Sequence, residues 1–224
     1  MPTYYVDFAN QTDRTWTMSV YQTVPGSIGL KSVSWKQTTV PKQGESGVEW
    51  EVDYNVVLGD LKQTGGKGVY KASQTLPTAL GKKWNIVYKD GVQQLEEVGG
   101  AEPGQIVVFN ASGEVAMPGM GMSGQASVFK ENVLSGSQAQ FEVTPTYYAG
   151  LFNNVVVGEV ISHNVAVGPE TLKFPSGLNM ATLTAYLDGS SIRLKVAYSQ
   201  GSSFSMDEVE ARITTIEAFN KQAA

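Results

Sequence analysis

Apolar and polar residues alternate over nine consecutive positions about a quarter of the way along the chain. The apolar members are Val48, Trp50, Val52, Tyr54 and Val56, and a polar residue lies between each pair. Successive side chains of a β-strand point to opposite faces, so this alternation predicts a strand with one buried and one wet face. Because the same period of two recurs along most of the chain, we expect an all-β protein.

Turn signals divide the chain into strands. Asp90-Gly91 and Asp188-Gly189 each separate two alternating runs and predict tight hairpins. Strands are expected in a hairpin over 3–24 and at 32–39, 47–58, 68–75, 84–89, 92–98, 104–111, 126–133, 138–148, 153–162, 170–175, 179–187 and 190–199.

We predict a mostly antiparallel β-sandwich. It is either one large sandwich in a single domain, 1–224, or two packed β-lobes, 1–115 and 125–204, joined by a Gly/Met/Pro loop at 116–124. Two segments, Ser32–Val52 and Ala126–Val143, share an order: aromatic plus lysine, a Gly/Ser-rich turn, then a strand ending in aromatic-Glu-Val. This likeness indicates two related lobes, or else only the small alphabet of β-sandwich sequences.

The last segment changes its period. Ser205 and Glu208 form a capping box, and the apolar residues after it recur every three or four positions. We therefore predict one amphipathic α-helix at 205–220, covering an open edge or end of a sheet. Its apolar positions are Met206, Val209, Ile213, Ile216 and Phe219.

Composition removes several function classes. The chain has no cysteine and one histidine, so thiolate nucleophiles, disulfides and Cys-based zinc sites are excluded. A net charge of −5 argues against a nucleic-acid partner. No apolar run reaches the roughly 18–20 residues of a transmembrane helix, and the chain opens without a signal peptide. We expect a soluble protein that is cytoplasmic or exported by a leaderless route.

No catalytic or metal-binding pattern accompanies the strands. His163 lies outside any nucleophile-elbow motif, and Glu49, Glu51 and Asp53 share what reads as the wet face of one strand. We therefore expect no catalytic residue, no metal and no cofactor.

Aromatic residues are the most suggestive set. Trp16 and Trp50 fall on the apolar side of their strands, which predicts core packing. Trp35 lies in a less regular stretch and is the candidate for an exposed ligand-binding aromatic, because such rings form platforms for sugars and lipids. Core packing is the favoured interpretation for each tryptophan.

Two stretches, Tyr4–Thr23 and Ser32–Val52, resemble the RhiA family. The resemblance lies in F-A-N-Q-T, T-W-T-M-x-V-Y-Q and S-V-S-W-K-Q-T-T, and covers about the first quarter of the chain. It implies a bacterial protein of the rhizosphere, under quorum-sensing control, with an accessory role in plant–microbe interaction. The family supplies no reaction and no site residue to carry over.

The leading hypothesis is a non-enzymatic binding protein that recognises a glycan, a lipid or a partner protein. One alternative is an aegerolysin-like lipid-binding protein, suggested by the opening order of strand, polar turn and Trp-bearing strand. A second is a carboxylate-dependent hydrolase, which would need two acidic groups converging in a pocket. A third is a structural protein that assembles as a homo-oligomer.

Overall fold

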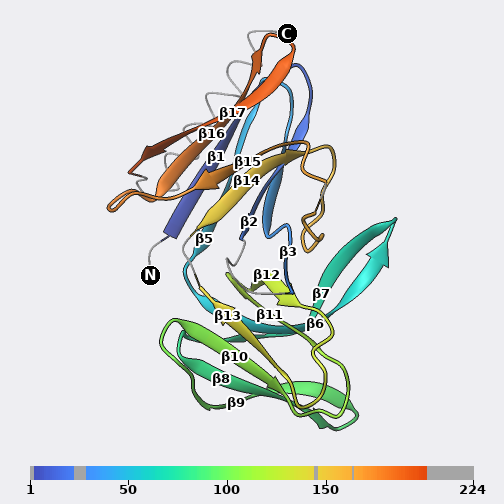
Figure 1. Cartoon of the computed structure of the whole chain (residues 1–224). Coiled ribbons are helices and arrows are strands. Elements are labelled where there is room, and N and C mark those ends of the chain that lie inside the picture. Colours follow the sequence, from blue (N-terminus) through green and yellow to red (C-terminus); the bar gives the residue numbers. More distant parts are fainter. Residues whose placement is uncertain (1–2, 23–28, 144–145, 163, 201–224) are drawn as a thin grey trace, which may run out of the picture.

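The structure is a computed structural model of the whole chain and describes residues 3–22, 29–143, 146–162 and 164–200. These ranges form seventeen β-strands in four sheets and contain no helix (Figure 1). The all-β class is confirmed for this part of the chain. The helix expected at 205–220 lies outside the described residues.

The strands fall into two lobes, each with two sheets facing one another across a core (Figure 1). We call the upper one the terminal lobe, with sheets β17-β16-β1-β5 and β15-β14-β2-β4. Its core holds Phe8, Trp16, Trp35, Trp50 and Leu183. Its strands are β1 (Thr3–Gln11), β2 (Trp16–Gln22), β4 (Lys36–Val40), β5 (Glu45–Glu51), β14 (Tyr147–Phe152), β15 (Val167–Leu172), β16 (Met180–Asp188) and β17 (Ser191–Ser199).

The lower one is the central lobe, with sheets β13-β10-β8-β9 and β3-β12-β11-β6-β7. Its core includes Trp84, Ile86, Val108, Met120 and Phe141. Its strands are β3 (Leu30–Ser32), β6 (Tyr54–Thr64), β7 (Lys67–Pro77), β8 (Lys82–Lys89), β9 (Val92–Gly100), β10 (Gln105–Asn110), β11 (Met117–Met122), β12 (Gln125–Lys130) and β13 (Gln138–Glu142).

Each half of the chain contributes four-strand sets to both lobes. The order β5-β1-β16-β17 in one lobe matches β13-β10-β8-β9 in the other, and β4-β2-β14-β15 matches β12-β11-β6-β7. Read along the chain, β1, β2, β4 and β5 followed by β6–β9 repeat as β10–β13 followed by β14–β17. Two tandem repeats, 3–100 and 105–199, have therefore exchanged their second sets, so that each lobe combines both repeats.

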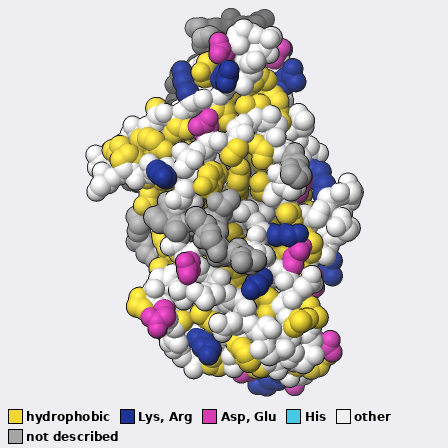
Figure 2. Space-filling view, in the orientation of Figure 1, with side chains coloured by type: hydrophobic (Ala, Val, Ile, Leu, Met, Phe, Trp, Pro, Cys, Tyr) yellow, Lys and Arg dark blue, Asp and Glu magenta, His cyan; other side chains and the backbone are white. Residues whose placement is uncertain are grey.

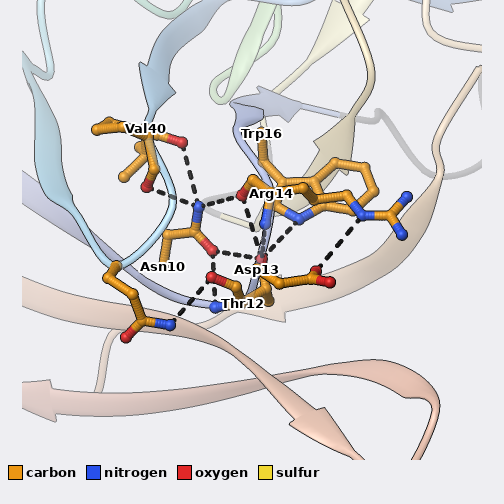
Figure 3. Close-up of polar contacts among 8 residues, drawn as sticks. Asn10, Thr12, Asp13, Arg14, Trp16 and Val40 are labelled. Atoms are coloured by element: carbon orange, nitrogen blue, oxygen red, sulfur yellow. Dashed lines mark hydrogen bonds and ion pairs between the residues drawn. The ribbon is translucent and has the colours of Figure 1, made fainter.

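Hydrogen bonds at the end of β1 and of β10 repeat the same pattern. Asn10 Nδ2 donates to the Arg14 carbonyl (2.8 Å), and Asn10 Oδ1 accepts from the backbone and hydroxyl of Thr12 (Figure 3). Asn110, exactly one hundred positions later, makes the same bonds to Glu114 and Ser112. This shared turn aligns the two repeats residue by residue and supports an internal duplication.

The sheets are mostly antiparallel, as expected, although β1 pairs with β16 and β10 with β8 in parallel. Two other expectations need correction. The lobes do not divide at 1–115 and 125–204, because the repeats exchange strands. The sequence likeness aligned Trp50 with Phe141. In the structure Phe141 is equivalent to Val48, because Val48 pairs with β1 as Phe141 pairs with β10, so the expected alignment is wrong by two residues.

The expected connecting loop at 116–124 is also wrong, because Met117–Met122 is strand β11 in the middle of a sheet. Its glycines reflect close packing of strands. A Cβ atom on Gly121 would lie 1.7 Å from the Gln125 carbonyl oxygen, and one on Gly119 would lie 2.7 Å from that of Val128. A glycine-rich segment therefore resembles a loop in sequence although it is a buried strand.

On the face shown in Figure 2, charged side chains of both signs are interspersed, and no basic patch is visible. The described ranges contain no helix long and apolar enough to cross a membrane.

Candidate functional site

Tyr88 is the one aromatic side chain of the described ranges that is mostly solvent-exposed, with 56% of its surface accessible. It lies on the wall of a groove of about 500 Å³ in the central lobe. The β6–β7 strands, the β8–β9 hairpin and the turn after β10 form this groove. Its other lining residues are Leu58, Gly59, Asp60, Ser73, Gln74, Gly91, Val92, Gln93, Glu114 and Val115.

The exposure of Tyr88 follows from its position at the tip of a hairpin. Trp84, Ile86 and Tyr88 alternate along β8 and share one face of it, and the first two are buried in the core. Asp90 and Gly91 both have positive φ and form the tight turn expected there, so β8 ends just after Tyr88. Tyr88 is thus a core-face residue at the end of its strand, where the ring reaches solvent.

Glu114 enters the groove from a rigid turn. Its carbonyl accepts a hydrogen bond from Asn110 Nδ2 (2.7 Å), and its backbone N–H donates to Ser112 Oγ (3.3 Å). Gln93 Nε2 ties the neighbouring hairpin to the same turn through Ser112 Oγ (2.9 Å) and the Val115 carbonyl (3.1 Å). The groove wall is therefore held together by bonds that leave the Glu114 carboxylate outside the network.

The terminal lobe provides an internal comparison for this groove. By the pairing registers, Tyr88 corresponds to Leu187 and Asp60 to Asn153, and the shared turn matches Glu114 with Arg14. Arg14 lies over the Trp16 ring, 5.6 Å from its centroid. Since the same backbone accepts these other side chains, the aromatic ring and the two carboxylates are not requirements of the fold.

A second cleft, of about 530 Å³, lies between the lobes. At its base the buried Glu159 carboxylate accepts hydrogen bonds from Lys67 Nζ (3.0 Å), the backbone N–H of Val156 (3.0 Å) and Asn164 Nδ2 (2.9 Å). Lys67 also donates to the Asn154 carbonyl (2.6 Å). These bonds satisfy both carboxylate oxygens, so the role of Glu159 is to hold this segment of the chain in place.

Glu159 lies in a connection whose length differs strongly between the two repeats. Strands β6 and β7 are joined by the two-residue turn Gly65-Gly66, whereas the β14–β15 connection runs over 153–166. Glu159 in this connection bridges to Val69 of β7, and Val160 bridges to Val33. The long connection therefore ties the β6–β7 hairpin of the central lobe to the other repeat (Figure 1).

Replacing Lys67 with methionine should lower the free energy of unfolding by about 3 kcal/mol, because it leaves the buried Glu159 carboxylate without its cation. Urea denaturation would measure the change. The matched control is Lys82→Met, which breaks the exposed pair with Glu97 and should cost less than about 1 kcal/mol. Equal losses in the two variants would contradict an anchoring role for Lys67.

Trp35, the sequence candidate for ligand contact, is fully buried. Its Nε1 donates to the Met122 carbonyl (3.1 Å), and its ring packs edge-on against Trp50 at 5.3 Å. Trp16, Trp50 and Trp84 are buried as well. The expectation of an exposed Trp35 is wrong, because the Trp35 backbone N–H donates to the Val20 carbonyl of β2 (3.1 Å) and its ring packs into the core of the terminal lobe.

Burial also shifts the pKa of ionisable groups in the terminal lobe. It raises the pKa of Tyr147 and of Tyr21 to about 12, since neither neutral hydroxyl is readily ionised away from water. It lowers the pKa of Lys36, whose ammonium lies over the Trp35 ring, while Asp53 and Glu49 act in the opposite sense. None of these groups lines the Tyr88 groove.

Within the described ranges there is no group of three or more His, Asp or Glu residues that could hold a metal ion. His163 lies outside the described residues. Glu49, Glu51 and Asp53 belong to no such group; Asp53 instead accepts a hydrogen bond from the Ser123 backbone (2.7 Å).

The architecture defines an all-β protein with two duplicated lobes and a groove bearing one exposed aromatic ring. Residues 1–197 match the RhiA family, and the chain belongs to that family. Protein RhiA of Rhizobium leguminosarum bv. viciae is 27% identical over 183 residues, which cover 75% of this chain and 76% of that protein. The resemblance in the first quarter of the sequence is thereby confirmed and extended. No solved structure matches the chain significantly.

Proposed function

We propose that this RhiA-family protein is a non-enzymatic recognition protein that binds a saccharide in the Tyr88 groove. The observation that carries the proposal is the exposed Tyr88 ring beside the Glu114 carboxylate in a concave surface. In the described part of the chain, the Glu114 carboxylate has no hydrogen-bond partner. It is therefore available to a ligand that supplies hydroxyl donors.

A sugar matches this combination of groups. The C–H face of a pyranose is apolar and stacks on an aromatic ring, while its hydroxyls donate strong hydrogen bonds to carboxylates. Val92 and Val115 are both about half exposed and extend the apolar wall next to Tyr88. Asp60, Gln93 and Glu114 supply acceptors on the other walls.

The proposal includes the role that the family resemblance implies, an accessory part in plant–microbe or cell-surface contact under quorum-sensing control. A saccharide-binding protein fits such a role because cell surfaces present glycans. Two alternatives are tested with the same purified protein: a pull-down detects a partner protein, and sedimentation detects self-assembly.

Replacing Tyr88 with alanine should weaken saccharide binding about tenfold, because the stacking surface is lost. A glycan array identifies the ligand, and isothermal titration calorimetry measures the dissociation constant. The control is Leu187→Ala, which removes the exposed counterpart of Tyr88 in the terminal lobe and should leave binding unchanged. Unchanged affinity in Tyr88→Ala, or no saccharide binding by the native protein, would contradict the proposal.

One observation favours the hydrolase alternative: Asp60 and Glu114 both line the groove. Glycosidases use such a pair of carboxylates. Incubating the protein with the array ligand and separating the products by chromatography distinguishes the two functions. Intact ligand supports recognition, whereas shortened saccharide would assign catalysis to this pair.

A further inference from the structure

We infer that the Tyr88 groove prefers a saccharide that carries a protonated primary amine over its acetylated or acidic counterpart. This inference rests on the proposed saccharide function and names the ligand class of the same site. Its basis is an exposed aromatic ring, Tyr88, beside two carboxylates, with no cationic residue in the described part of the groove lining.

Asp60 and Glu114 are the charged residues among the described residues lining the groove, and both are exposed. Asp60 lies 3.5 Å from Lys62 Nζ, which offsets part of its charge. No cation of the described residues lies within ion-pair distance of Glu114. Asp60 also pairs across the strands with Lys71, so its charge is offset on two sides, and Glu114 carries the uncompensated negative charge of the groove lining.

The internal repeat shows that this charge is not needed to build the turn. The equivalent turn of the terminal lobe carries Arg14 where the central lobe carries Glu114, with the same asparagine hydrogen bonds on both sides. Either sign of charge is compatible with the backbone. The carboxylate thus determines what the groove attracts, and the hydrogen-bonded turn fixes the backbone from which it extends.

A protonated amine satisfies both features at once. An ammonium group forms charge-assisted hydrogen bonds with a carboxylate, and it is attracted to the face of a tyrosine ring. Acetylation removes the charge, and an acidic sugar would be repelled by Glu114 and Asp60. The preference is therefore expected to be electrostatic, and it should weaken when salt screens the exposed carboxylates.

The test uses glucosamine oligosaccharides of one length in two forms, with free amines and fully N-acetylated, titrated into the full chain by calorimetry. The free-amine form should bind about fivefold more tightly at low salt. Glu114→Gln should weaken binding of the free-amine form more than that of the acetylated form, and so remove most of this difference. Glu102→Gln, which alters an exposed carboxylate outside the groove, should preserve it.

The outcomes distinguish failure of the amine preference from failure of the proposed saccharide binding. Equal or tighter binding of the acetylated form, or a preference that survives Glu114→Gln and about 0.5 M salt, overturns the amine preference and leaves saccharide recognition standing. Failure of both forms, together with every neutral and acidic glycan of the array, overturns the saccharide function itself.

Discussion

Replacing Trp35 with alanine is expected to lower the free energy of unfolding by about 4 kcal/mol. Trp35 is fully buried, stacks on Tyr147 with ring centroids 6.1 Å apart, and meets Trp50 edge-on. The substitution would leave a large cavity and deprive the Met122 carbonyl of its hydrogen-bond donor. Urea denaturation followed by tryptophan fluorescence and circular dichroism measures the loss.

Trp35→Phe is the matched control, because it keeps an aromatic ring and removes only the indole N–H and part of the volume. It should cost about 2 kcal/mol. Saccharide binding at Tyr88 should persist wherever either variant is folded, since the two residues lie in different lobes. Loss of ligand binding with unchanged stability would return Trp35 to the role of a ligand contact.

Replacing Asn10 with aspartate is expected to cost about 3–5 kcal/mol, as when a buried charge is left without a partner. Asn10 is 1% exposed, and its Nδ2 donates to the carbonyls of Arg14 (2.8 Å), Val40 (3.2 Å) and Pro41 (2.8 Å) (Figure 3). An aspartate would place a carboxylate oxygen against these carbonyl oxygens. Chemical denaturation at neutral pH measures the effect.

Asn110→Asp should cost a similar amount, because Asn110 Nδ2 donates to the Glu114 and Val133 carbonyls, each at 2.7 Å. The control is Asn153→Asp, an exposed position where the same chemical change should be within about 0.5 kcal/mol of neutral. Lowering the pH should recover part of the loss, because a protonated carboxyl can donate again. If Asn10→Asp unfolds no more easily than Asn153→Asp, the Asn10 hydrogen bonds do not stabilise the terminal lobe.

The Asn110 substitution also has a functional consequence. Its turn carries Glu114 into the Tyr88 groove, so a folded Asn110→Asp protein should bind saccharide less tightly. Asn10→Asp disturbs the equivalent turn of the other lobe, where Arg14 occupies the corresponding position. The pair of variants therefore separates general loss of stability from loss of the groove wall.

The candidate site was misplaced by sequence reasoning for a physical reason. Alternation assigns Tyr88 to the same face as Trp84 and Ile86, and such a residue is normally core. Its exposure depends on where the opposing sheet ends, which is a property of the assembled lobe. Trp35 was misjudged in the opposite sense, because the residue before β4 still bonds to β2 and places its ring in the core, where the indole N–H finds a backbone acceptor.

Local sequence determined the all-β class and most strand positions. It also determined the faces of strands such as β5 and β17 and the Asp90-Gly91 hairpin. These depend on the period of two and on turn conformations, which act over a few neighbouring residues. Only the tertiary structure decided which strands are neighbours, because pairing joins segments far apart in the chain. The parallel pairs, the exchange of strands between repeats and the glycine-rich buried strand β11 all arise at that level. The Tyr88 groove follows from the same assembly, since segments from β6 to the turn after β10 meet only when the central lobe is complete.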